Sequence, residues 1–480
     1  MKKNKLDLSD ALFWGLTGIF VLFLAFMYGY SAFSYKITVD EWEHMQASWM
    51  IGQGMVPFRD FFEHHHPLMW YLTAPFLMNS PSLLAFNGTR LMTLVVFAVN
   101  CGWVYGIARL LSGRKAASFL SLFFYMVSYI TIAKFADFRP DHLMICMMLG
   151  GVWFLLKYFE KQRSLDLNVS FFLFFLSFCF LQKVILFFLP LGLLFLVLLW
   201  DKRISFKAVF TACLLPFVCT VAYGVYLWMT NSFTDYFELN WLLNKAWFRD
   251  YEESTPFFCQ LYVWGGLAAA VVYAFRNEDW RSRFFFTLII LYFAVWFAGP
   301  RPYITYYLPI IPFLAISWGF LMDKYFVSKM GRRWIGLLLI GYFFVEGICY
   351  FEIYFEGKHP SYYPMSYVLS AMKPDERVVS FSPSFLVPFH QPVSYYWFGL
   401  GRGAFWDHML FQRRPLPDLN QAMLDEKTRF VRIGFVYNQQ YTDNTDTSQI
   451  AYQPDEKILN QFYRKTFYPF IYERKPNSIK

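Results

Sequence analysis

VSFFLFFLSFCFLQKVILFFLPLGLLFLVLLW, residues 169–200, is a nearly unbroken apolar run, interrupted by Gln182 and Lys183. As a single helix it would be about 48 Å long. The hydrocarbon core of a bilayer is only about 30 Å thick. The stretch therefore predicts either one overlong span or two spans that turn at Lys183, and the choice fixes the topology of everything that follows.

The later Lys and Arg residues decide between these two topologies, because such residues concentrate on the cytoplasmic side of membrane proteins. With two spans, ten of them fall inside: Lys202, Arg203, Lys207, Arg276, Arg281, Arg283, Lys324, Lys329, Arg332 and Arg333. Only Lys245, Arg249 and Arg301 are then left in the later outer loops. One span would invert this bias, so we expect two spans with Lys183 at the outer tip.

The composition agrees with a membrane protein. Of the 480 residues, 57% are hydrophobic and only 16% are charged, against about 25% charged in soluble domains. The net charge of +9 is explained by cations that orient the chain in the membrane, so it calls for no nucleic-acid partner. The seven cysteines all lie in or at the ends of apolar runs and show no metal-ligand spacing.

Apolar runs predict eleven spans in all. We expect them at roughly 11–33, 86–110, 116–133, 141–159, 168–181, 184–200, 207–229, 257–275, 283–299, 303–322 and 334–354. The first run follows the basic residues MKKNK and lacks a small-residue cleavage site, so it is expected to be a retained helix whose basic end lies inside.

The C-terminal region, 355–480, differs in character and would lie outside after eleven spans. RVVSFS (377–382) and RFVRIGFVY (429–437) are typical of strands, and LNQAMLDEK (419–427) and DEKILNQFYRK (455–465) of amphipathic helices. The sequence thus predicts an all-α polytopic membrane domain, 1–354, and a small extracytoplasmic α/β domain, 355–480. The expected location is a plasma membrane, the inner membrane in a bacterium.

The first outer segment, 34–85, is long, polar and aromatic. Trp42, Met45 and Trp49 recur at helical spacing, which predicts a helix lying in the membrane interface. Thr38 and Glu41 match the capping-box pattern, so helix capping explains Glu41 about as well as catalysis does. Asp40, a few residues after the first span, is the stronger catalytic candidate.

The same segment contains PFRDFFEHHHPL, residues 57–68, with Arg59, Glu63 and three consecutive histidines. Pro67 is expected to open a short helix. A divalent metal held by Glu63 and His65 is one interpretation. Hydrogen bonding of His65 and His66 to a polar ligand or a lipid phosphate is the other.

The second outer loop, AKFADFRPDHL (133–143), brings Arg139 and Asp141 to the start of a span. Helix-end chemistry, with Pro140 in the first position and Asp141 in the first turn, is an alternative to a functional role. Orientation rules deplete cations from outer loops, and several of those that remain lie at span ends: Lys36, Arg59, Arg90, Lys134, Arg139, Lys183, Lys245, Arg249 and Arg301. A site for an anionic headgroup would need such cations, and the candidates selected for it are Arg59, Arg139, Lys183 and Arg301. Snorkelling to lipid phosphates is the alternative for each of them.

These motifs together resemble a known family. The pair Asp40-Glu41 after the first span, then GQGMVPFRDFFEHHHPL (52–68), GTRL (88–91), RPD (139–141) and YITYYLPIIPFL (303–314) are similar to patterns of the GT-C glycosyltransferases. The closest likeness is to the branch with protein O-mannosyltransferases, the lipid A aminoarabinose transferase and the RgtA/B/C/D-like enzymes. It covers about residues 10–320, and the three consecutive histidines depart slightly from the family's spacing.

The resemblance implies a polyprenyl-phosphate-linked sugar donor and transfer to a lipid, glycan or protein acceptor on the outer face. It implies that the base is Asp40, with Glu41 beside it, and it matches Arg139 and Asp141 to the family's second-loop acid or arginine. Arg59, His65, His66, Arg139, Lys183 and Arg301 are then candidates for the phosphate. A single base predicts inversion at the sugar carbon, and a second carboxylate would be needed for retention.

Two other functions fit parts of the sequence. A transporter or lipid flippase would show repeated halves and helices broken near the midplane, whereas the polar residues here gather in outer loops. A non-catalytic membrane scaffold with an outer binding domain is the second. Glu346 lies within the eleventh expected span, where a charge is costly, and it is not assigned to the active site.

Overall fold

The computed structural model describes residues 8–33, 38–78, 83–247, 257–299, 304–327, 333–355, 362–373, 375–381, 389–397, 411, 414, 418–433, 454–468 and 470–476. Most of it is helical. The first part contains α1 (Leu8–Ala32), α2 (Val39–Gly52), α3 (Leu68–Leu77), α4 (Leu83–Ser112), α5 (Lys115–Val127), α6 (Tyr129–Lys134), α7 (Pro140–Lys161), α8 (Ser164–Phe180), the 3-10 turn η1 (Gln182–Val184), α9 (Ile185–Trp200) and α10 (Phe206–Met229).

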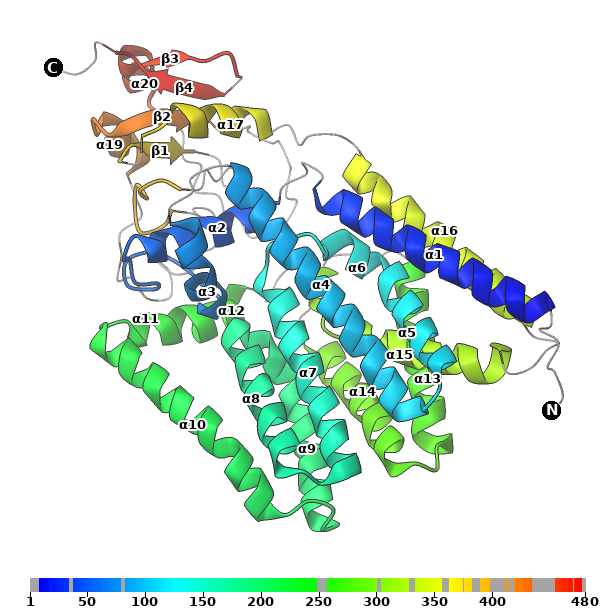
Figure 1. Ribbon diagram of the computed structural model, residues 1–480. Coiled ribbons are helices and arrows are strands. Elements are labelled where there is room, and N and C mark those ends of the chain that lie inside the picture. Colours follow the sequence, from blue (N-terminus) through cyan, green and yellow to red (C-terminus); the bar gives the residue numbers. More distant parts are fainter. Residues whose placement is uncertain are drawn as a thin grey trace.

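The second part of the helical body follows the same pattern. It contains α11 (Phe233–Phe237), the π-helix η2 (Glu238–Leu243), α12 (Asn244–Trp247), α13 (Phe257–Arg276), α14 (Trp280–Ala298), the 3-10 turn η3 (Ile304–Tyr307), α15 (Ile311–Met322), the π-helix η4 (Asp323–Val327) and α16 (Arg333–Phe355). Figure 1 shows α1 and α16 side by side along one flank, and α10 at the opposite flank.

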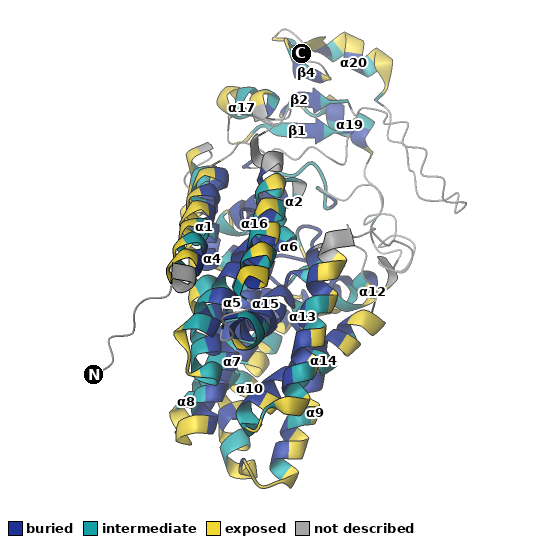
Figure 2. Ribbon diagram, turned by 90° about the vertical axis from the view of Figure 1, so that its right-hand side faces the viewer, coloured by how far each residue is buried: buried dark blue, intermediate teal, exposed yellow. Residues whose placement is uncertain are grey.

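The expected spans all coincide with helices. Seven are long and apolar enough to cross a membrane: α1, α4, α7, α9 with its preceding turn, α10, α14 and α16. The remaining expected spans correspond to α13 and to the shorter α5, α8 and α15. The chain is therefore a multi-pass membrane protein. Large apolar side chains on α10 face outward, among them Phe210 and Phe217, as expected for a helix solvated by lipid (Figure 2).

The expected turn at Lys183 is confirmed, because α8 ends at Phe180 and α9 begins at Ile185. Two other spans differ from expectation. The run 116–133 is broken at Ser128 into α5 and α6. In 303–322 only Ile311–Met322 is α-helical, since Pro309 and Pro312 supply no backbone N–H to a continuous helix.

The helix α2 also differs from expectation. Its predicted apolar stripe would leave a polar face uncovered, yet every side chain from Glu41 to Met50 is buried. Trp42 stacks on Phe86 of α4 with ring centroids 5.7 Å apart, and Gln46 is covered by the segment 389–397. Protein therefore surrounds α2 from Glu41 to Met50, and the prediction that one face of this helix is buried in the membrane interface is wrong.

The C-terminal region carries a small sheet at one end of the helical body (Figures 1 and 2). Its strands are β1 (Arg377–Ser380), β2 (Thr428–Arg432), β3 (Tyr463–Lys465) and β4 (Ile471–Arg474), in the order β1-β2-β4-β3. β1 and β2 are parallel, and the other pairs are antiparallel. The helices here are α17 (Tyr362–Ala371), α19 (Leu419–Leu424) and α20 (Glu456–Phe462).

Two of these strands come from the expected pattern and two do not. β1 and β2 lie in the predicted strand segments, whereas the predicted helix 455–465 ends at Phe462 and its last residues form β3. Val379, Met423 and Leu459 pack together in a core of their own. The division of the chain at residue 354 stays a prediction.

Candidate active site

Four charged side chains form a continuous chain of ion pairs. One Nη of Arg139 pairs with the carboxylate of Asp40, and its Nε lies 3.2 Å from Oδ2 of Asp141. The other oxygen of Asp141 pairs with Nζ of Lys183. The structure thus brings together four of the residues selected from the sequence, from three separate segments of the chain.

Local sequence signals place each of these residues. Asp40 lies in the first turn of α2, whose capping box at Thr38 and Glu41 is present as expected. Arg139 is the N-cap of α7, and Asp141 follows Pro140 in the first helical turn. Lys183 lies in the turn η1 between α8 and α9. Three helix ends therefore meet at one place.

The two carboxylates in this chain of ion pairs differ in how far they are exposed. The Asp40 side chain is 41% exposed, whereas that of Asp141 is 1% exposed and covered by two cations. Asp40 is consequently the carboxylate of this chain of ion pairs that a substrate can reach.

Glu41 points away from this chain of ion pairs into a buried salt bridge. Arg90 of α4 binds both of its carboxylate oxygens, at 3.0 and 2.8 Å, and also donates to the carbonyl of Ala32 at 3.2 Å. The side chain of Glu41 is fully buried. This geometry ties α1, α2 and α4 together.

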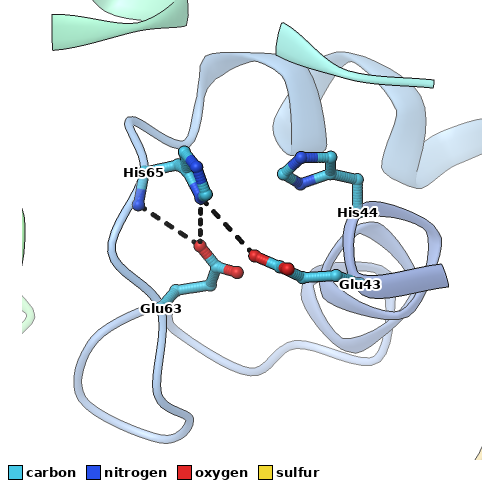
Figure 3. Close-up of side chains that lie close together, drawn as sticks. All are labelled: Glu43, His44, Glu63 and His65. Atoms are coloured by element: carbon cyan, nitrogen blue, oxygen red, sulfur yellow. Dashed lines mark hydrogen bonds and ion pairs between the residues drawn. The ribbon is translucent and has the colours of Figure 1, made fainter. Parts of the chain in front are cut away.

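A second cluster lies one helical turn along α2. Glu43, His44, Glu63 and His65 offer potential ligand atoms that all lie within 4.8 Å of one another, and Figure 3 shows them converging from α2 and the loop 57–66. His65 Nδ1 is 3.3 Å from Glu63 Oε2 and 3.5 Å from Glu43 Oε1. Asp40, Glu43 and His44 share one face of α2, because they are three and four residues apart.

Burial shifts the pKa values in this cluster. It raises the pKa of Glu63 to about 7. Burial, and then the neighbouring carboxylate of Glu63, raises the pKa of Glu43 well above its usual range. Burial, reinforced by His65, lowers the pKa of His44 well below its usual value. Burial therefore favours the protonated carboxyl of Glu43 and the neutral imidazole of His44.

The donor set of this cluster fits a divalent cation. Glu43 Oε1 and Glu63 Oε1 are buried and have no hydrogen-bond partner among the described residues. Carboxylate oxygens and one imidazole nitrogen suit ions such as Mn²⁺, Mg²⁺ or Zn²⁺. Glu43, Glu63 and His65 are thus the residues that would hold such an ion.

The other two histidines hold the loop in place. His66 Nδ1 lies 2.6 Å from the carbonyl of Phe178 and its Nε2 lies 3.0 Å from the hydroxyl of Tyr236. Both ring nitrogens are therefore used, and burial lowers the pKa of His66 to about 4. The carbonyl of His64 accepts from Gln182 at 3.0 Å and from Asn244 at 2.8 Å.

The remaining predicted cations lie apart from these clusters or outside the described residues. Arg59 forms a two-pronged ion pair with Asp60, at 2.7 and 2.8 Å, and donates to the carbonyl of Thr230 at 3.2 Å. Its partners thus differ from those of Arg139 and Lys183. Arg301 lies outside the described residues.

The segment 389–397 covers the histidine-rich loop, a contact that the sequence did not predict. The side chain of Gln46 binds the backbone of Phe389 and His390, at 2.5 and 2.6 Å. Phe62 donates its backbone N–H to the carbonyl of Tyr395 at 2.9 Å, and Trp397 donates to the carbonyl of Phe62 at 2.9 Å. Part of the C-terminal region is thereby built into the surroundings of the site.

Sequence reasoning also missed Glu43 as a site residue. The available signal was its position, one helical turn after Asp40 and on the same face of the predicted helix. Arg90 was noted only as one of several cations at span ends, and no local pattern pairs it with Glu41.

The fold and the site define a class of multi-pass membrane protein in which acidic residues from the loops gather at one end of a helical bundle. Residues 65–228 match the family model of dolichyl-phosphate-mannose-protein mannosyltransferases. The chain is similar to this family over that part of its length. None of the curated protein sequences matches it significantly.

Solved structures with a similar fold include ArnT from Cupriavidus metallidurans. Its complex with undecaprenyl phosphate aligns with a TM-score of 0.61 at 12% identity, over 88% of this chain and 93% of that one. Its apo state aligns with a TM-score of 0.59 at 13% identity, over the same shares. The oligosaccharyltransferase AglB from Archaeoglobus fulgidus aligns with a TM-score of 0.46 at 10% identity, over 87% and 69% of the two chains.

Proposed function

We propose that this protein is a glycosyltransferase that moves a sugar from a polyprenyl-phosphate donor to an acceptor hydroxyl on the outer face of the membrane, with Asp40 as the base. The observation that carries the assignment is accessibility. Asp40 is 41% exposed and held by Arg139, whereas the other two candidate carboxylates, Glu41 and Asp141, are buried under cations. The ArnT structure bound to undecaprenyl phosphate supports the choice of donor class.

In the proposed step, the Asp40 carboxylate takes the proton of the acceptor hydroxyl. The acceptor oxygen forms a bond to the anomeric carbon of the sugar. The bond from that carbon to the phosphate oxygen breaks, and the polyprenyl phosphate leaves with the electron pair. Attack and departure on opposite faces invert the anomeric centre.

The engagement of the two other candidate carboxylates, Glu41 and Asp141, supports inversion. A retaining route needs a second carboxylate as nucleophile. Both oxygens of Glu41 bind Arg90, and both oxygens of Asp141 are engaged by Arg139 and Lys183. Asp40 would therefore work as a single base.

The leaving phosphate needs positive charge. Arg139 pairs with Asp40, and Lys183 joins the same chain of ion pairs through Asp141, so both cations are already balanced by carboxylates. A divalent cation at Glu43, Glu63 and His65 would add positive charge beside the phosphate, and we include it in the proposal. His65 would be a ligand of that cation, whereas His66 would contribute by shaping the loop, since both of its ring nitrogens are already hydrogen-bonded.

The same proposal fixes the orientation. The basic N-terminus would lie in the cytoplasm, and the site and the C-terminal sheet would lie outside, in a plasma membrane that is the inner membrane if the source is a bacterium. The acceptor would be a lipid, a glycan or a protein.

Replacement of Asp40 tests the base. We expect Asp40→Asn to lower transfer from a polyprenyl-phosphate-linked sugar by about 10²–10⁴-fold in purified protein, with the unfolding temperature unchanged. Asp60→Asn is the matched control, because Asp60 is also a loop carboxylate paired with an arginine. Full transfer by Asp40→Asn would show that another group is the base. If the protein transfers sugar from none of the polyprenyl-linked donors but moves the lipid across the membrane of vesicles, a flippase would be favoured.

A further inference from the structure

Glu346 of α16 carries a carboxylate within an apolar span. The apolar part of α16 ends at Phe351, five residues or about 8 Å beyond Glu346. Among the residues that the structure describes, no Lys, Arg or His forms an ion pair with this carboxylate. A charge at this depth is costly unless something compensates it, and intramembrane carboxylates usually mark a functional position.

Glu346 lines a small lateral cavity of about 20 Å³ together with Ser128 and the four tyrosines Tyr129, Tyr262, Tyr342 and Tyr350. The cavity lies where α5 ends and α6 begins, at Ser128. Its volume has room for about one water-sized group. The break in the expected span 116–133 thus leaves a small space between helices, mostly apolar in its lining, into which Glu346 brings a carboxylate.

The cavity faces the lipid rather than the chain of ion pairs at Asp40. Tyr342 is 41% exposed, and the neighbouring Leu338 and Val345 on the same face of α16 are 74% and 60% exposed. Tyrosines are typical of the level where lipid headgroups meet the apolar core. A ligand would therefore enter from the bilayer.

We propose that this cavity binds the primary ammonium group of a membrane phospholipid such as phosphatidylethanolamine. The carboxylate of Glu346 would accept a charge-assisted hydrogen bond, and the surrounding tyrosine rings attract cations through their faces. A primary ammonium is about the size of one water molecule, whereas a choline headgroup carries three additional methyl groups and exceeds the space. The proposal rests on the fold and not on the proposed transfer reaction.

Native mass spectrometry of the purified full chain tests this site. The probes are phosphatidylethanolamine, phosphatidylcholine and phosphatidylglycerol with identical acyl chains. We expect the wild-type protein to retain phosphatidylethanolamine over phosphatidylcholine by about tenfold, the effect of one hydrogen bond to a charged group. Glu346→Gln should reduce its retention to the level of phosphatidylcholine, and Tyr342→Phe should weaken it in the same direction.

Glu160→Gln is the matched control, because Glu160 is an exposed carboxylate in the last turn of another span, α7. It should leave the preference unchanged. Equal retention of the three lipids by the wild-type protein would overturn the proposal, as would a preference that survives Glu346→Gln. If Glu346→Gln fails to fold, the wild-type comparison and Tyr342→Phe decide. None of these measurements requires sugar transfer, so the two proposals can fail separately.

Discussion

The indole Nε1 of Trp70 donates a hydrogen bond to Nδ1 of His44 over 3.2 Å. Indole is a donor only, so the neutral imidazole of His44 must carry its own proton on Nε2. That nitrogen is buried and has no partner among the described residues. Neither ring nitrogen of His44 therefore has a free lone pair for a cation, whereas Glu43, Glu63 and His65 can each offer one.

The first prediction concerns metal binding at this cluster. With Mn²⁺ alone as the probe, we expect Glu63→Gln to weaken binding at least about tenfold, because it removes a buried ligand oxygen. His44→Asn should leave the affinity unchanged. Calorimetry of the purified protein measures both. Equal losses in the two variants would make His44 a ligand, and absence of Mn²⁺ binding in the wild type would refute a metal role.

A second prediction concerns the buried pair of Glu41 and Arg90. Breaking such a pair leaves an uncompensated buried charge and costs about 3–5 kcal/mol. We expect Glu41→Gln to lower the free energy of unfolding by this amount, and the double variant with Arg90→Met to recover part of it. Asp60→Asn breaks an exposed pair and should cost about 1 kcal/mol or less. Reversible unfolding in mixed micelles gives these values, and equal costs would contradict a structural role for Glu41.

The third prediction concerns pH. Burial lowers the pKa of His66 to about 4, below its value of about 6.5 in the unfolded chain. The folded state therefore prefers the neutral ring. The stability that His66 contributes is complete above pH 6.5 and is lost as the pH falls through about 4. His66→Gln should flatten this part of the stability profile, and an unchanged slope would assign the acid sensitivity to other groups.

The fourth prediction concerns the hydrogen bonds between Gln46 of α2 and the segment 389–397. Gln46→Ala removes the acceptor for the Phe389 amide, so we expect exchange of that amide with deuterium to become at least about tenfold faster, since local opening costs less. Gln53→Ala is the control, because Gln53 makes only an exposed contact with Met78. Mass-spectrometric exchange of peptides that cover 389–397 reports both variants. Unaltered exchange in Gln46→Ala would mean that other contacts hold the segment.

The features that were predicted correctly from the sequence are those that depend on interactions between neighbouring residues. The turn at Lys183, the capping box at Thr38 and the start of α7 at Pro140 each depend on neighbouring residues, and all three are present. The sequence also selected four candidates, because neither the orientation of the chain in the membrane nor the chemistry of helix ends fully explains these charged residues. They are Asp40, Arg139, Asp141 and Lys183.

Pairings between distant segments could not be predicted in the same way. Arg90 lies 49 residues from Glu41, and Gln46 lies 343 residues from Phe389. Nothing in the local pattern selects these partners, because tertiary packing decides them. The same limit explains α2, whose apolar stripe predicted a membrane-facing helix although both of its faces are buried by the rest of the chain.

The contact between Trp397 and Phe62 also has a consequence for synthesis. The two residues are 335 positions apart, which at about 5–20 residues per second corresponds to roughly 20–70 s on the ribosome. The loop 57–66 is made early, whereas the segment 389–397 that covers it is made much later. The finished geometry around this loop therefore forms late in synthesis or after it, and a nascent chain released before residue 389 would carry the loop without the backbone partners of Gln46 and Phe62.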